Sequence, residues 1–195
     1  MIIKFYILNI KRELEPNNYM NYLREAVLER VSLRELALII ALAGLASFLP
    51  FFIHIQWLVG PIVNAILIIV LFLSGLRSAI VVSAVPSLMA LAGGLLPVFL
   101  APAIPFIIAS NIIFVSIIYY QYYNSNQTDA YWRVSFLGAF VKFTFLFLSA
   151  QFLSFFIANP KAATVLGVML GWSQLFSALA GAIIAFGVLK MIKRI

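Results

Sequence analysis

A single lysine, Lys142, stands in the middle of the apolar stretch Tyr131–Phe156. A charged side chain at membrane depth is costly, so it usually marks a functional site with a partner. The acidic residues of the chain all lie at or before Glu35 or at Asp129, and none lies deep inside an apolar segment. The sequence therefore predicts that the partner of Lys142 comes from outside the chain, as a bound carboxylate or phosphate.

Uncharged polar residues at similar depth would complete a binding layer. At about 1.5 Å per residue, ten residues reach the bilayer centre. Counting this way places Lys142, Asn111 and Gln174 within a turn or two of one another. Toward the outer face we expect further polar and aromatic side chains, namely Asn64, Gln151, Trp172, His54 and Gln56. Together these residues predict a solute pocket that opens outward, with Lys142 at its floor.

A second interpretation of the same residues is purely structural. Lysine can snorkel, so Lys142 would then direct its ammonium group toward the inner headgroups. Asn111 and Gln174 would only join neighbouring helices, through bonds worth about 0.6 kcal/mol each. The sequence alone leaves both interpretations open.

Several kinds of chemistry lack the residues they need. The chain has no cysteine and one histidine, which argues against iron–sulfur, haem-thiolate and zinc-thiolate sites, so we predict no metal and no cofactor. No pair of carboxylates lies within the apolar region, so we expect no catalysis. The net charge of +7 comes from basic residues flanking hydrophobic segments, which indicates membrane orientation rather than a nucleic-acid partner.

The composition identifies the class of protein that holds these residues. Of 195 residues, 65% are hydrophobic and 10% are charged, whereas a soluble domain is about a quarter charged. We predict an all-α integral membrane protein with a cytoplasmic or interfacial segment over 1–32, containing a helix over 18–30, and a transmembrane domain over 33–195. The domain has room for six spanning helices, expected over 34–52, 59–74, 78–96, from the prolines of 97–105 to 123, 131–156 and 164–189.

The distribution of basic residues predicts the orientation of this six-helix bundle. With both termini inside, every lysine and arginine except Lys142 and Lys161 falls in an inner segment. An excess of lysine and arginine is typical of the cytoplasmic loops of membrane proteins. We therefore expect a multi-pass protein of the plasma membrane with both termini in the cytoplasm.

The first predicted span carries small residues on one face. Ala37, Ala41 and Gly44 recur at helical spacing, which lets another backbone approach closely. Six short helices, both termini inside and the motif Ala37-Leu-Ile-Ile-Ala41 resemble the substrate-binding S components of energy-coupling factor (ECF) transporters. The resemblance implies that these small residues dock on a transmembrane coupling subunit driven by two ATPases. It also implies a high-affinity binder of a vitamin or precursor, with no catalysis in this chain.

The middle of the chain is also similar to a small bacterial family of such proteins. The similar segments are GPIVNAILII (60–69), VPSLMALAGGLLPVFLAPAIPFIIASN (85–111), FLGAFVKFTFLFL (136–148) and VMLGWSQLFSALAGAIIAF (168–186). Automatic labels often call members "iron hydrogenase", which the absence of cysteine does not support. The predicted function is uptake of a small, vitamin-like or anionic solute. The alternatives are a stand-alone carrier or scaffold and, less favoured, an enzyme that modifies lipids or isoprenoids.

Overall fold

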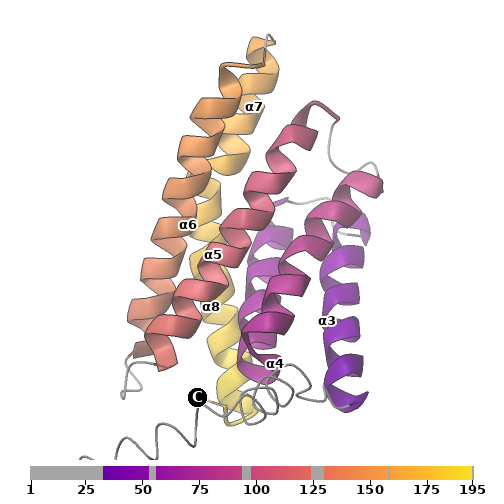
Figure 1. Cartoon of the computed structure of the whole chain (residues 1–195), viewed down its shortest axis with the longest axis vertical. Helices are drawn as coiled ribbons and strands as arrows, with labels where there is room; N and C mark the ends of the chain where they lie inside the picture. Colours follow the sequence, from indigo (N-terminus) through magenta and orange to yellow (C-terminus); the bar gives the residue numbers. More distant parts are fainter. Residues whose placement is uncertain (1–32, 53–55, 94–97, 124–129, 158, 195) are drawn as a thin grey trace, which may run out of the picture. The chain divides into compact units, whose positions relative to one another are not determined.

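The computed structural model describes residues 33–52, 56–93, 98–123, 130–157 and 159–194 (Figure 1). Residues 37–195 form one compact unit, and residues 1–36 form a second, of which only 33–36 are described. All contacts given below lie within the larger unit. The predicted interfacial helix and His54 lie outside the described residues.

Every regular element among the described residues is a helix, as the sequence predicts. The elements are α3 (Leu33–Phe52), α4 (Gln56–Ala92), the 3-10 helix η1 (Val98–Ala103), α5 (Ile104–Tyr123), α6 (Ala130–Ser154), α7 (Pro160–Leu170) and α8 (Trp172–Met191). Within the described part, four helical stretches are long and apolar enough to cross a membrane, namely Leu58–Ala92, Leu100–Tyr122, Ala130–Ser154 and Pro160–Met191. These stretches indicate a multi-pass membrane protein, and α3 adds the shorter apolar stretch Leu36–Phe48.

Helix α4 consists of two arms joined at Gly75, where φ is 80° and ψ is 177°. This backbone conformation is essentially restricted to glycine. Asn64 on the first arm and Ser83 on the second are linked through Lys142 and Asn111 by consecutive hydrogen bonds. A straight helix would place Asn64 and Ser83 about 28 Å apart, beyond the reach of these bonds. The chain therefore reverses at Gly75, where the sequence predicts a tight turn.

The last predicted span begins earlier than expected and is broken. Helix α7 starts at Pro160, with the Asn159 side chain accepting a hydrogen bond from the backbone N–H of Lys161. The predicted turn over 158–163 therefore lies partly inside a helix, because this cap and Pro160 favour a helix start. Gly171, with φ −86° and ψ −138°, separates α7 from α8. Figure 1 shows the two helices following one another along one line.

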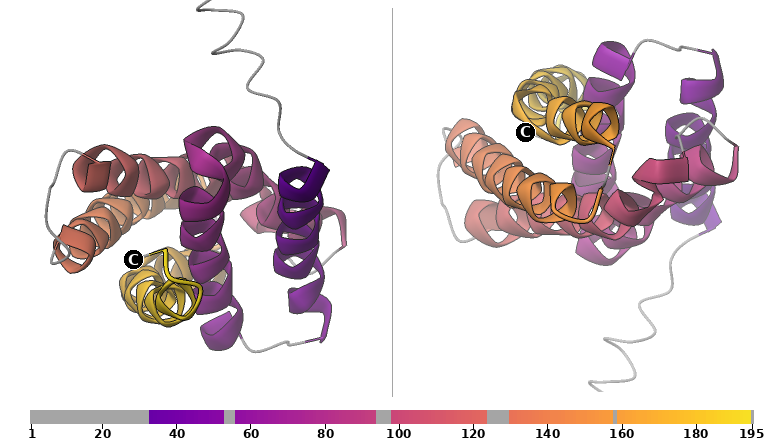
Figure 2. Two further views of the ribbon diagram at one scale, coloured as in Figure 1. Left: turned by 90° about the horizontal axis from the view of Figure 1, so that it is seen from below. Right: turned by 90° about the horizontal axis from the view of Figure 1, so that it is seen from above.

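Close packing joins the first arm of α4 to α8, and the end-on views show these helices side by side (Figure 2). A Cβ at Gly181 would lie 2.6 Å from the Asn64 Cβ and 2.8 Å from the Pro61 carbonyl oxygen. The small-residue ridge Ser177, Gly181 and Ala185 thus allows the two backbones to approach closely. Helix α5 packs in the same way along α6.

Two separate apolar clusters fill the interior. The larger cluster joins Ala46 of α3 to residues of α4, α5, α6 and α8, and its α6 members are Tyr131, Val134 and Ala139. The smaller cluster joins η1, α6 and α7, and its α6 members are Leu146, Ala150 and Leu153. Lys142 lies on α6 between the two clusters.

Candidate functional site

Lys142 is buried, with 2% of its surface exposed, and its nitrogen faces two amide oxygens. Nζ donates to Oδ1 of Asn64 at 2.6 Å and to Oδ1 of Asn111 at 2.7 Å. The Phe114 ring lies beneath the nitrogen, 5.3 Å from Nζ to its centroid, within the range of a cation–π contact. The side chain therefore points into the bundle, and the snorkelling interpretation is wrong for this structure.

The two amides are themselves held in position. Asn64 Nδ2 donates to the Gly60 carbonyl oxygen at 3.0 Å and to Ser177 Oγ at 2.9 Å. Both amide hydrogens are thus used within the protein, which directs Oδ1 toward Lys142. Asn111 Nδ2 donates to the Ser83 carbonyl oxygen at 3.3 Å, which orients its Oδ1 in the same way.

We call Asn64, Ser83, Asn111, Lys142 and Ser177 the polar layer. The layer is drawn from both arms of α4 and from α5, α6 and α8. Ser83 is fully buried, and Asn64 and Asn111 are 3% and 4% exposed. Within the layer the lysine is hydrogen-bonded but has no carboxylate partner. Burying an ion without an opposite charge costs several kcal/mol. The protonated Lys142 side chain thus leaves the layer with an uncompensated positive charge.

A groove lies beside the polar layer, between the first arm of α4 and the junction of α7 with α8. Its volume is about 320 Å³. Val59, Gly60 and Pro61 form one wall, and Ser177 lies in the opposite wall with its hydroxyl group bonded to Asn64. Ser177 in the groove wall is therefore connected to Lys142 through the side chain of Asn64.

The break at Gly171 supplies Gln174 with a hydrogen-bond partner other than Lys142. Interrupting the helix frees carbonyl groups of its last turn. Gln174 Nε2 donates to the Met169 carbonyl oxygen at 2.9 Å, and Ser173 Oγ donates to the carbonyl oxygens of Met169 and Val168 at 3.0 and 2.7 Å. Gln174 lines the groove but makes no hydrogen bond to the lysine.

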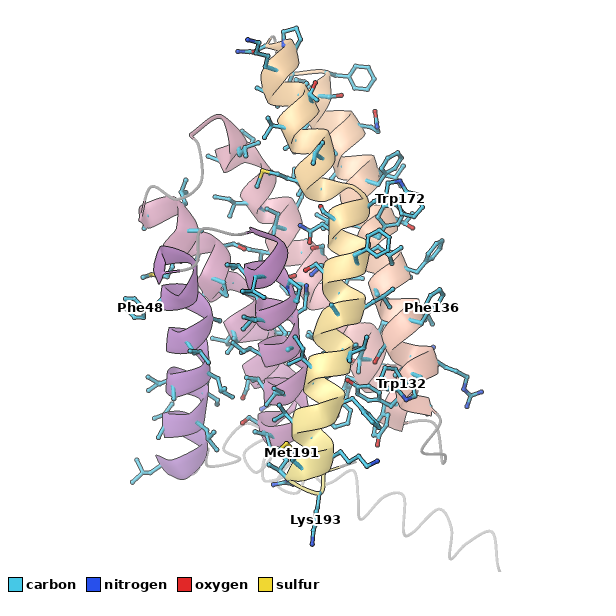
Figure 3. All side chains as sticks on the ribbon, turned by 180° about the vertical axis from the view of Figure 1, so that it is seen from behind. Phe48, Trp132, Phe136, Trp172, Met191 and Lys193 are labelled. Carbon is cyan, nitrogen blue, oxygen red and sulfur yellow. The ribbon has the colours of Figure 1, made fainter. Side chains whose placement is uncertain are left out.

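Other predicted binding residues lie on the surface of the described structure. Trp172 is 63% exposed and packs against Phe143, with ring centroids 4.8 Å apart. Figure 3 shows Trp172, Phe136 and Trp132 on the same side of the view. Gln151 is also exposed. Among the described residues neither Trp172 nor Gln151 makes a hydrogen bond to the polar layer, and their binding role stays a prediction.

The predicted docking residues lie on the open side of α3. Ala46 belongs to the larger cluster, and Ile39, Leu42 and Ala43 pack against it, whereas Ala37 and Ala41 are exposed. A Cβ added at Gly44 would meet no atom within 4 Å. This stripe is thus unoccupied by the described part of the chain.

Sequence reasoning missed two members of the polar layer. In the sequence Ser177 stands out only as a member of a small-residue ridge. A serine in one apolar segment could nevertheless have been considered as a hydrogen-bond partner for an asparagine in another. Ser83 contributes its backbone carbonyl oxygen, which no side-chain pattern reveals. Asn64 was expected above this layer, toward the outer face, whereas its Oδ1 lies 2.6 Å from Lys142 Nζ. Helix α4 begins at Gln56, three residues before the predicted start.

No protein-family model, curated protein or solved structure matches the chain. The resemblance to ECF S components therefore stays a prediction.

Proposed function

We propose that the protein is the substrate-binding membrane subunit of an uptake system for a small anionic solute. The observation that carries the proposal is the buried Lys142, whose two hydrogen-bond acceptors are neutral amide oxygens. The apolar segments contain no acidic residue that would neutralise the lysine. A carboxylate or phosphate that reached the polar layer would supply the missing charge and form charge-assisted hydrogen bonds.

The uptake role extends this proposal to partners and topology. In our proposal the two arms of α4 cross the membrane separately, which with α3, α5, α6 and the α7–α8 pair gives six crossings and cytoplasmic termini. The stripe of Ala37, Ala41 and Gly44 would dock on an ECF-type coupling subunit that works with two ATPases. The support for docking is the open face of α3.

The decisive experiment removes the charge of Lys142 and keeps its shape. The full chain is purified in lipid nanodiscs, and bound small molecules are identified by native mass spectrometry. The parent and Lys161→Met are expected to retain the same anionic molecule, whereas Lys142→Met is expected to lose it. Lys161 is an exposed lysine at the start of α7, so it controls for the loss of one positive charge. Equal retention by Lys142→Met contradicts the proposal.

The broken α7–α8 helix favours a second candidate, a carrier that works alone. Discontinuous helices form the substrate sites of many secondary transporters. Transport of the identified anion into liposomes that contain only this chain would support the carrier. A requirement for added coupling and ATPase subunits would support the uptake subunit.

A further inference from the structure

We infer that the groove is the binding site of an amphiphilic carboxylate, whose anionic head faces the polar layer and whose apolar part lies along α4, α7 and α8. This inference rests on the proposed function and adds a class of solute and a route of access. It is carried by the shape of the groove, its free hydrogen-bonding groups and the position of Lys142 behind it.

The polar side of the groove has unused hydrogen-bonding capacity. Ser177 Oγ accepts the Asn64 amide hydrogen, while its own hydrogen has no acceptor in the part of the chain that the structure describes. Gln174 donates to Met169, and its Oε1 has no hydrogen bond among the described residues. A protonated or ionised carboxyl group can accept from the hydroxyl group of Ser177. The head of the solute would therefore bind at the end of the groove nearest Asn64.

The charge lies directly behind this end. The Asn64 amide is the link between Ser177 and Lys142, bonded to both at 2.9 and 2.6 Å. An anion at Ser177 would thus be one side chain away from the ammonium group, in an interior where opposite charges attract strongly. Direct contact of the head with Lys142 would require Asn64 to rotate and give up its bonds to Gly60, Ser177 and Lys142. None of the lining residues carries a charge, so Lys142 dominates the electrostatics of the groove.

The remaining lining residues are apolar and match a hydrocarbon or aromatic body. They include Val59, Pro61, Val168, Met169, Phe176 and Ala180. Val168 and Phe176 are 63% and 58% exposed, so the groove opens on an apolar outer face of the helices. An amphiphile dissolved in the bilayer would reach the site sideways. The volume of about 320 Å³ lies at the lower end of small-ligand pockets, which favours one short chain over a two-chain lipid.

Photolabelling of the full chain in nanodiscs tests the inference. The probe is a medium-chain fatty acid that carries a diazirine, and its methyl ester is the uncharged control. We expect the acid to label the peptides that contain Val59–Pro61 and Val168–Ala180 at least about tenfold more than the ester does, and excess octanoate to compete. Equal labelling by acid and ester would show ordinary contact with lipid and would overturn the inference.

Two variants separate this inference from the proposed function. Ala180→Leu fills the groove without altering the polar layer, and is expected to reduce labelling at least about tenfold. Gly187→Leu adds the same kind of side chain to α8 at a position with open space around it, and is expected to label as the parent does. Labelling could instead depend on Lys142 but map to other peptides and be unaffected by Ala180→Leu. That result would overturn the groove as the binding site and leave the proposed function standing. If Lys142→Met labels as the parent does and also retains every bound anion, both proposals fail.

Discussion

The ammonium nitrogen of Lys142 lies 2.6 Å from Oδ1 of Asn64, whose two amide hydrogens are both donated elsewhere. The amide therefore has one orientation that satisfies all its bonds, with its oxygen toward the lysine. This relationship joins α6 to the first arm of α4 and fixes the position of the only charge deep in the described helices. Among the described residues, that charge has amide oxygens and no carboxylate as partners.

Asn111→Asp would place a carboxylate beside Lys142. Because an internal anion then neutralises the ammonium group, we expect the affinity for the anionic solute to fall by more than about tenfold. The change in affinity is measured by titration with the solute identified from the parent protein. Asn159→Asp makes the same change at the exposed cap of α7 and should bind as the parent does. Unchanged affinity in Asn111→Asp would remove Lys142 from the binding site.

Gly181→Ala should destabilise the protein by about 1–3 kcal/mol through overpacking. The added Cβ meets the Asn64 Cβ and two backbone atoms of α4, so relief requires movement of a helix rather than of one side chain. Gly187→Ala adds the same methyl group to α8 where no atom lies within 4 Å, and should leave stability unchanged or slightly raised. The free energy of unfolding in mixed detergent is the measurement, and equal effects would refute the close packing of α4 with α8.

Gly75→Ala should also destabilise, by about 1–3 kcal/mol, although space around Gly75 is open. The reason is the backbone conformation, with φ at 80°, which a residue with a Cβ rarely adopts. Gly44→Ala is the control, since it also has open surroundings but lies within a regular helix. Thermal unfolding of the two variants should separate them, and a neutral Gly75→Ala would contradict the reversal of α4.

Ala41→Trp should prevent association with a coupling subunit while leaving the fold unchanged. Ala41 is exposed on α3, so the fold should accommodate the large ring, which would keep another helix at a distance. Ile183→Trp alters an exposed position of α8 and serves as the control. Co-purification with the coupling subunit and its ATPases is the readout. Normal association of Ala41→Trp would place the docking face elsewhere.

Much of the site was predictable because membrane depth restricts polar residues. Depth alone brought Asn111 to Lys142, since both are rare polar residues near the middle of apolar segments. Depth counting gave no hydrogen-bond partner for Gln174, because it assumes continuous helices and Gly171 interrupts one. The interruption offers Gln174 a carbonyl acceptor on its own chain, at Met169. Asn64 was not grouped with Lys142 because the start of α4 lies in a short polar stretch, where the helix boundary is weakly specified.

The two apolar clusters have a consequence for how the molecule opens. Because the two clusters are separate, we expect each to open as a cooperative unit, with the polar layer between them. Helix α6 passes through both clusters, so its backbone amide hydrogens should exchange with solvent at two different rates. The amides near Leu146 and Ala150 belong to the smaller cluster and should exchange faster than those near Val134 and Ala139, in the larger cluster. Local opening of the smaller cluster would then expose Lys142 while the larger cluster stays folded.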